Sequence, residues 1–141
     1  MLTVSDLMMK TPYTTEPSAT LREVLMLMKV EDYRQVPVVD DDKKIIGIIT
    51  ERDIRLAMNS PMLSGEKWLD DMTLDNVRVR ECMTKSPITI RSTLPAYEAA
   101  DMLRVYKFGA LPVVDDDKLV GILSVTDFLT HFVVSQREEE M

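Results

Sequence analysis

Short apolar runs alternate with amphipathic stretches along the first half of the chain. Two runs rich in β-branched residues, 36–39 and 45–49, flank an Asp-rich turn, and this pattern predicts an antiparallel β-hairpin. Ahead of them, apolar residues recur at helical spacing over 20–29, at Leu21, Val24, Leu25 and Met28. The sequence Thr20-Leu21-Arg22-Glu23 is typical of a capping box and indicates where that helix begins.

The same pattern returns in the second half. Seven consecutive residues are identical between 37–43 and 112–118, and an offset of 75 aligns the preceding residues. After the turn the offset is 74, which places one extra residue near Lys43 or Lys44. The second copy therefore predicts a helix that begins at Pro95, with Ala96, Ala99, Ala100 and Leu103 on its apolar face, and a hairpin over 111–114 and 119–123.

Each copy has the order strand, helix, strand, strand, helix. A short leading turn precedes an extended segment at 12–15 or 87–90, and the copies end in helices over 51–58, stopped by Asn59-Ser60-Pro61, and 125–135. Because a strand-helix-strand connection makes the outer strands parallel, each copy should form a small mixed sheet covered by helices. We therefore expect an α+β fold of two repeats packed by pseudo-twofold symmetry. The expected boundaries are 1–59 for repeat 1, 60–76 for a linker, 77–135 for repeat 2 and 136–141 for a charged tail.

The linker has no counterpart in repeat 1. It begins with turn residues at Ser60-Pro61 and Ser64-Gly65, and Leu69 and Met72 suggest a helical turn. We expect Trp68, the sole tryptophan, to cover an open core edge in preference to stacking on a ligand.

Composition narrows the classes of function. The 141 residues carry a formal charge of -7, which opposes binding to nucleic acid or an anionic membrane. No apolar run is long enough to span a bilayer, and no leader peptide is evident, so we expect a cytoplasmic protein. The single Cys82 falls where Leu7 lies in repeat 1, which predicts a small core side chain. The eleven Met residues are typical of adaptable packing or of an exposed dimer surface.

The candidate chemistry lies at the start of the last helix of each repeat. Thr50-Glu51-Arg52-Asp53 and Ser124-Val125-Thr126-Asp127 each fit a capping box, which by itself explains them. Each also follows a glycine-containing strand, at Gly47 or Gly121, so a helix N-terminus should lie at the sheet edge. Amides and the helix dipole there favour a phosphate, and a carboxylate can accept both hydroxyls of a ribose. The spacing thus also suits a nucleoside phosphate.

The doubled Pro-Val-Val-Asp, with Gly-Ile-Ile-Thr-Glu-Arg-Asp and Gly-Ile-Leu-Ser-Val-Thr-Asp, resembles the cystathionine-beta-synthase (CBS) domain pair, or Bateman module. The resemblance extends from about Val4 to His131. It implies clefts that bind AMP, ADP, ATP or S-adenosylmethionine, modules that pair into homodimers, and regulation of a partner protein whose identity the sequence does not give. It implies no cofactor, no metal and no catalysis, and a module that stands alone.

Carried over by position, the resemblance predicts the residues of two composite nucleotide sites. The carboxylates match Asp53 and Asp127, the hydroxyl residues match Thr50 and Ser124, and Ile48 and Ile122 would lie against the base. The opposite repeat would complete each site. Asp53 would be completed by Thr84, Thr89, Phe108, Gly109 and Ala110, and Asp127 by Thr14, Tyr33, Arg34 and Gln35.

The two predicted sites differ. Arg52 beside Asp53 is a candidate phosphate ligand, with the alternative that it is a solvated residue paired with Glu51 or Asp53. At the second site, Thr126 takes the place of Arg52 beside Asp127, and the bulkier Arg34-Gln35 is expected on the opposite side of that site. We therefore expect tighter binding at the Asp53 site.

Three alternatives stay open at this point. The Asp runs 40–42 and 115–117 fit hairpin turns better than a divalent metal site. The sole His131 lacks a second ligand or a nucleophile beside it, so an enzyme is the least favoured class. The favoured class is a regulator that binds an adenine nucleotide, with an S-adenosylmethionine binder as one alternative. The other alternative is a ligand-independent dimerisation module in which Thr50 and Asp53 are only helix caps.

Overall fold

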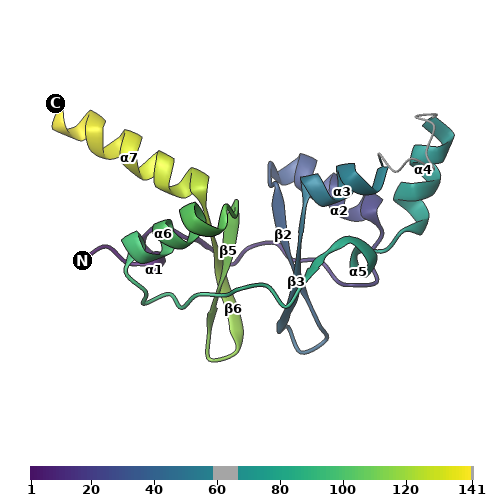
Figure 1. The fold of residues 1–141 in the computed structure, drawn as a ribbon, viewed down its shortest axis with the longest axis horizontal. Helices are drawn as coiled ribbons and strands as arrows, with labels where there is room; N and C mark the ends of the chain where they lie inside the picture. Colours follow the sequence, from purple (N-terminus) through teal and green to yellow (C-terminus); the bar gives the residue numbers. More distant parts are fainter. Residues whose placement is uncertain (59–66, 141) are drawn as a thin grey trace. The chain divides into compact units, whose positions relative to one another are not determined.

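The computed structural model describes residues 1–58 and 67–140 and divides the chain into two compact units (Figure 1). Unit 1 comprises residues 1–12 and 88–141, and unit 2 comprises residues 13–87. Unit 1 contains α1 (Val4–Leu7), β1 (Met9–Lys10), α6 (Ala96–Tyr106), β5 (Ala110–Asp115), β6 (Lys118–Ser124) and α7 (Val125–Glu139). Unit 2 contains α2 (Leu21–Glu31), β2 (Gln35–Val39), β3 (Ile45–Thr50), α3 (Glu51–Met58), α4 (Lys67–Asn76), α5 (Val79–Cys82) and β4 (Thr84–Lys85). The predicted α+β class is confirmed.

The predicted helices form for the expected local reasons. Thr20 caps α2, because its side chain accepts a hydrogen bond of 3.2 Å from the Glu23 amide. The buried positions of α2 are Leu21, Val24 and Met28, and those of α6 are Ala96, Ala99 and Leu103. Pro95 is the N-cap of α6 and not its first helical residue, a shift of one position from the prediction.

Both predicted hairpins are antiparallel, and their turns show why Asp is repeated there. Strand β2 pairs with β3, and β5 pairs with β6. In the second hairpin Asp116 and Asp117 have φ of 51° and 64°, the left-handed conformation that a two-residue turn requires. In the longer first turn, Asp40 accepts hydrogen bonds of 2.9 Å from the amides of Asp42 and Lys44.

The third strand of each sheet comes from the leading segment of the other repeat. Strand β1 pairs with β6 and β4 pairs with β3, so the sheet orders are β1-β6-β5 and β2-β3-β4. The leading segments, predicted as turns, are four-residue helices followed by these two-residue strands. The predicted parallel strands consist of one bridge each, Thr15 with Val38 and Ile90 with Val113. The compact units therefore cut across the repeats seen in the sequence.

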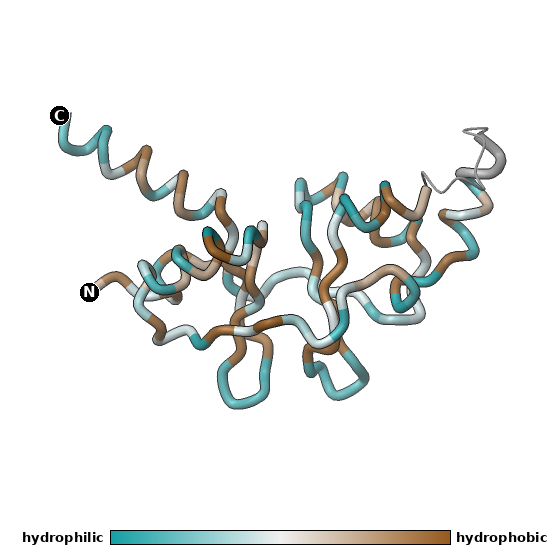
Figure 2. The backbone as a smooth tube through the Cα atoms, viewed as in Figure 1, coloured by the Kyte–Doolittle hydropathy of each residue, from teal (hydrophilic) through white to brown (hydrophobic). Residues whose placement is uncertain are grey.

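Each unit has its own apolar core beneath its helices. Val36, Val38 and Ile49 form the strand side of the unit 2 core, and Leu111, Val113 and Leu123 form that of unit 1. In Figure 2 the strands are largely brown and the hairpin turns teal, in keeping with buried strands and exposed turns. Cys82 packs against the unit 2 core and Leu7 against the unit 1 core, as predicted. Burial, followed by the charges of Glu81 and Asp53, raises the pKa of the Cys82 thiol.

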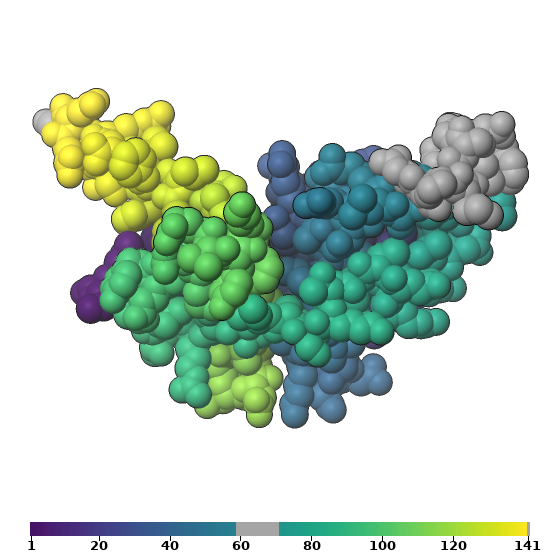
Figure 3. All heavy atoms as spheres, viewed as in Figure 1, coloured from purple at the N-terminus to yellow at the C-terminus, as the bar shows by residue number. Residues whose placement is uncertain are grey.

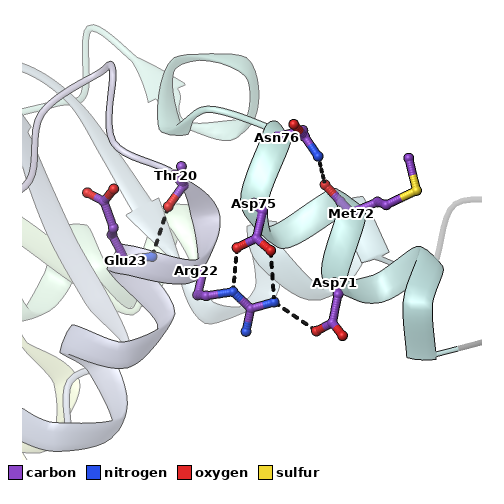
Figure 4. Close-up of polar contacts among 7 residues, drawn as sticks. All are labelled: Thr20, Arg22, Glu23, Asp71, Met72, Asp75 and Asn76. Carbon is purple, nitrogen blue, oxygen red and sulfur yellow. Dashed lines mark hydrogen bonds and ion pairs between the residues drawn. The ribbon is translucent and has the colours of Figure 1, made fainter.

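The linker contributes α4, longer than the single predicted turn. Figure 4 shows how Arg22 of α2 reaches it: the guanidinium forms ion pairs of 2.8 Å with Asp71 and 2.5 Å with Asp75. These two carboxylates raise the pKa of Arg22 further above its ordinary value. Leu74 of α4 belongs to the unit 2 core. The predicted helix stop at Asn59-Ser60-Pro61, the Ser64-Gly65 turn and the side chain of Trp68 lie outside the described residues. The predicted tail is not separate, because α7 continues to Glu139.

Methionine sulfur atoms fill the space above the two strand glycines. A Cβ at Gly47 would lie 2.5 Å from Met83 Sδ and 3.0 Å from the Thr84 carbonyl oxygen. At Gly121 it would lie 2.6 Å from Met8 Sδ and 2.8 Å from the Met9 carbonyl oxygen. Backbone obstructs the second position more closely than the first.

We expect Gly121→Ala to lower the free energy of unfolding by about 1–3 kcal/mol, and Gly47→Ala by less, because the backbone carbonyl lies farther from the added Cβ at Gly47. Urea unfolding monitored by circular dichroism measures both values. As a control, the double variant Gly47→Ala/Met83→Ala should lose less stability than the sum of its two single variants, because the methionine no longer obstructs the new Cβ. In the double variant Gly121→Ala/Met8→Ala only part of the loss should be relieved, because the Met9 carbonyl remains. An equal loss at both glycines would contradict the backbone clash at Gly121.

Candidate functional site

The start of α3 in unit 2 is a completed capping box. The Thr50 amide donates to Asp53 Oδ2 at 2.9 Å, and the Asp53 amide donates to Thr50 Oγ1 at 3.1 Å. Both side chains are half-buried. This arrangement fixes the hydroxyl and the carboxylate side by side at the end of β3.

The start of α7 in unit 1 repeats this geometry. The Ser124 amide donates to Asp127 Oδ2 at 2.8 Å, and the Asp127 amide donates to Ser124 Oγ at 3.3 Å. The Ser124 hydroxyl also lies 3.1 Å from Asp127 Oδ2. The capping interpretation of both motifs is therefore confirmed, and it does not compete with ligand binding, because these bonds use only Oδ2. Within the described residues, neither Asp Oδ1 has a hydrogen-bond partner.

Most first-turn amides are already used. The Glu51 amide donates to the Arg34 carbonyl at 2.9 Å, and the Val125 amide donates to the Gly109 carbonyl at 3.1 Å. With the Asp53 and Asp127 amides bonded to the capping hydroxyls, each first turn retains one amide without a partner in the described chain, at Arg52 or Thr126. The cradle of free amides expected from the sequence is thus reduced to one per helix.

The loops before β2 and β5 bring further predicted residues beside the helix of the same unit. Gln35 pairs with Thr50 and Ala110 pairs with Ser124, so Arg34 and Gly109 adjoin the helix starts. Across the sheets, Thr84 pairs with Ile48. Ile122 and Ala110 are buried, Ile48 and Tyr33 are half-buried, and Thr14, Thr84, Thr89, Phe108 and Gly109 are exposed. Arg34 and Gln35, which were expected at the Asp127 site, thus lie beside the start of α3, and Gly109 and Ala110, which were expected at the Asp53 site, lie beside the start of α7. Completion of each site by the other expected residues stays a prediction.

Cationic side chains distinguish the start of α3. Arg34, Arg52 and Arg55 are all exposed in this part of unit 2. The corresponding residues in unit 1 are Gly109, Thr126 and Leu129, none of which is charged. No ion pair joins Arg52 to Glu51 or Asp53, all of which the structure describes. An anion is therefore attracted to α3 more than to α7.

Aromatic pairs that the sequence analysis missed flank both loops. The rings of Tyr13 and Tyr33 lie 5.8 Å apart, and those of Tyr106 and Phe108 lie 5.5 Å apart and are stacked. Burial, with the charge of Glu31 and the neighbouring Tyr13, raises the pKa of Tyr33. Tyr33 and Phe108 are equivalent in the repeat alignment, and this equivalence was the signal that could have indicated the two aromatic pairs.

Other chemistry has little support in the described part of the chain. His131 is exposed on α7, where the Ser135 hydroxyl donates to its carbonyl at 2.7 Å and lies 3.4 Å from Nε2. No three His, Cys, Asp or Glu side chains gather there as a metal site. None of the described helices has the length and apolar character needed to cross a bilayer.

Solved structures of similar proteins contain adenosine compounds. The chain is 27% identical to CBSX2 of Arabidopsis thaliana, solved in complex with AMP, covering 96% of this chain and 99% of that one with a TM-score of 0.79. It is 26% identical to the CBS domain pair of protein MJ0100, solved with 5′-methylthioadenosine and S-adenosyl-L-methionine. That match covers 96% and 98% of the two chains with a TM-score of 0.81.

Sequence comparisons identify the family. A CBS domain-containing protein of Dictyostelium discoideum is 37% identical over 129 residues, which cover 89% of this chain and 88% of the relative. Inosine-5′-monophosphate dehydrogenase of Mycobacterium tuberculosis is 36% identical over 124 residues, but the chain spans only 21% of that enzyme's length. The CBS domain model matches residues 4–60 and 79–134. The chain therefore belongs to the CBS domain family and carries two copies of the domain, as its repeats predicted.

Proposed function

We propose that the chain is a non-catalytic regulatory module that binds an adenosine-containing ligand at the starts of α3 and α7. The observation that carries the proposal is the repeated pair of a hydroxyl and a carboxylate, each locked by its own capping box at a sheet edge. A preorganised carboxylate with an unused oxygen suits the two adjacent hydroxyls of a ribose. The adenosine compounds bound to CBSX2 and to the MJ0100 domain pair support the same ligand class.

The charge difference between the units supports different ligands at the two helices. Arg52 and Arg34 favour the phosphates of AMP, ADP or ATP at α3. The uncharged Thr126 and Gly109 favour an adenosine compound without phosphate, such as S-adenosylmethionine, at α7. We therefore assign the tighter nucleotide binding to the Asp53 site, with Ile48 against the base, and the weaker to the Asp127 site, with Ile122 in that role.

Assembly into a homodimer accompanies this proposal, and α7 supplies its surface. None of the fifteen residues of α7 is buried, and Leu129 is 60% exposed. Leu129 and Val133 continue one apolar stripe along the helix. Figure 3 shows the last turns of α7, in yellow, standing clear of the remainder of unit 1.

A ligand-independent dimerisation module is the second candidate. The observation in its favour is that the capping bonds are complete without a ligand. Ligand response and assembly are therefore tested separately.

For ligand binding, we expect AMP, ADP or ATP at 100 times its dissociation constant to stabilise the folded protein by about 2.7 kcal/mol. S-adenosylmethionine is tested alongside, and GTP is the control ligand. Thermal unfolding monitored by calorimetry gives the shift. The double variant Asp53→Ala/Asp127→Ala should lose the response and also about 1 kcal/mol per cap.

The matched control variant is Asp6→Ala/Glu81→Ala. Asp6 and Glu81 cap α1 and α5 through the Thr3 and Arg78 amides at 2.8 and 2.6 Å, so this variant loses the same kind of bond outside the proposed site. It should keep the full ligand response. An unchanged response in the Asp53 and Asp127 double variant would refute the site, and no response to any adenosine compound would favour the assembly module.

For assembly, Leu129→Asp should raise the dissociation constant of the dimer by about 100-fold or more, because a symmetric dimer loses two leucine side chains from its interface. Sedimentation equilibrium measures the dissociation constant. The control is Lys44→Asp, which places the same carboxylate at an exposed polar position of the first hairpin turn and should leave the dimer intact. A wild-type chain that sediments as a monomer at micromolar concentration would contradict this part of the proposal.

A further inference from the structure

The two units are joined at two places, where the chain passes from Pro12 to Tyr13 and from Pro87 to Ile88. At both places the sequence has one pattern of four residues: a hydroxyl residue, a proline, a residue with a large side chain and a threonine. The two segments are Thr11-Pro12-Tyr13-Thr14 and Ser86-Pro87-Ile88-Thr89. We call them the first crossing and the second crossing.

Hydrogen bonds fix the chain on both sides of the first crossing. Before it, β1 pairs with β6 of unit 1, where Lys10 lies opposite Gly121. After it, the Thr15 amide donates to the Pro37 carbonyl at 3.0 Å, and the Val39 amide donates to the Thr15 carbonyl at 3.0 Å, both within unit 2. The first crossing alone therefore separates a residue held in the sheet of unit 1 from a residue held in the sheet of unit 2.

The second crossing is fixed in the same way. At its start the Ser86 amide donates to the Ile46 carbonyl at 3.1 Å and continues the pairing of β4 with β3. After it, the Ile90 amide donates to the Pro112 carbonyl at 3.1 Å, and the Val114 amide donates to the Ile90 carbonyl at 2.8 Å. Because both ends of each crossing are held, any change in the orientation of one unit against the other requires new backbone angles within the two crossings.

The first residue of each crossing has a strained backbone. The φ angle is 47° at Thr11 and 48° at Ser86, in the left-handed region. A residue before proline normally has an extended backbone, and a side chain makes the left-handed conformation costly. Among the other described residues, positive φ outside glycine occurs in the hairpin turns and at the C-caps of α2 and α6, where it is usual. Strain of this kind persists only where the surrounding contacts hold it.

This strain gives each crossing two competing conformations. An extended backbone at Thr11 or Ser86 relieves the local strain, whereas the left-handed backbone keeps the hydrogen bonds on both sides of the crossing. The Thr11 hydroxyl donates to the Lys10 carbonyl at 2.7 Å, which helps to hold the left-handed conformation. Because the next residue is a proline with a fixed φ, rotation is concentrated at Thr11 and Ser86.

From this geometry we propose that Thr11 and Ser86 are a pair of coupled hinges between the two units. When one of them converts from the left-handed to the extended backbone, the orientation of the units changes and the other must convert with it, because both crossings join the same two units. The proposal does not rest on ligand binding, since the strain and the short crossings belong to the chain itself. It supplies a second arrangement of the units that a ligand or a partner can favour.

Nuclear magnetic resonance relaxation dispersion on the full-length chain tests the proposal, because it detects exchange on the microsecond-to-millisecond timescale of hinge motions. We expect exchange with one common rate constant at both crossings. Thr11→Gly should lower the population of the minor conformation by about tenfold, because glycine adopts the left-handed backbone without the cost of a side chain. The population should fall at the second crossing as well, although that crossing is unchanged in sequence.

Two further variants test the direction and the specificity of the effect. Thr11→Val removes the bond from the hydroxyl to the Lys10 carbonyl and keeps a branched side chain, so it should raise the population of the minor conformation at both crossings. Lys43→Gly is the matched control, because Lys43 has φ of 64° in a hairpin turn within unit 2. It relieves the same kind of strain and should leave exchange at both crossings unchanged. Circular dichroism confirms the fold of each variant.

Three outcomes would overturn the proposal. Absence of exchange at both crossings, in the wild-type chain and in Thr11→Val, would show that no second conformation is populated. An effect of Thr11→Gly confined to the first crossing would show two independent loops instead of coupled hinges. An equal effect of Lys43→Gly would show a general change in stability.

Discussion

The close approach of a two-residue strand to a strand glycine is the constraint on which each unit depends. At Gly47 and Gly121 the space of a side chain is taken by a methionine sulfur and a backbone carbonyl. This approach lets β4 join β3 and β1 join β6 at the sheet edge. Since β3 and β6 run directly into α3 and α7, the same contact fixes where those helices begin. The geometry of the candidate site therefore follows from the packing at the glycines three residues earlier.

The capping boxes connect stability with candidate function. Each aspartate caps its helix through Oδ2, which accepts a hydrogen bond from the Thr50 or Ser124 amide. This bond also fixes the position of the other carboxylate oxygen before any ligand binds. A group that is already held in place loses little conformational entropy on binding. Because the amides of Glu51 and Val125 bond to the preceding loops, the proposed recognition of a phosphate depends more on the arginine side chains than on the helix backbone. This dependence makes the two helix starts chemically unequal although their backbones are alike.

Local patterns predicted much of the fold. The hairpins, the helices α2 and α6 and the two capping motifs depend on residues close together in the sequence, so Thr20, Asp40 and Asp53 indicated them directly. The exchange of leading segments was missed because it depends on contacts between distant residues, such as Met9 with Ile122. Helix α4 was predicted only as a turn because its stability comes from Arg22 and the unit 2 core. The loss of free amides at α3 likewise depends on Arg34, seventeen residues before Glu51.

The two repeats have diverged in the charge around the helix start and in the covering of the helix face. Unit 2 has the arginines around its helix start, and α4 closes its helix face. Unit 1 has no arginine at its helix start, and Tyr97 and Phe132 are exposed on its helices. In the proposed function a phosphate therefore has most to gain in unit 2, where Arg34 and Arg52 adjoin the helix start. Unit 1 retains exposed aromatic surface, and burial of that surface would be favourable. In the proposed function, regulation requires that the ligand change the free energy of a contact that a partner protein recognises.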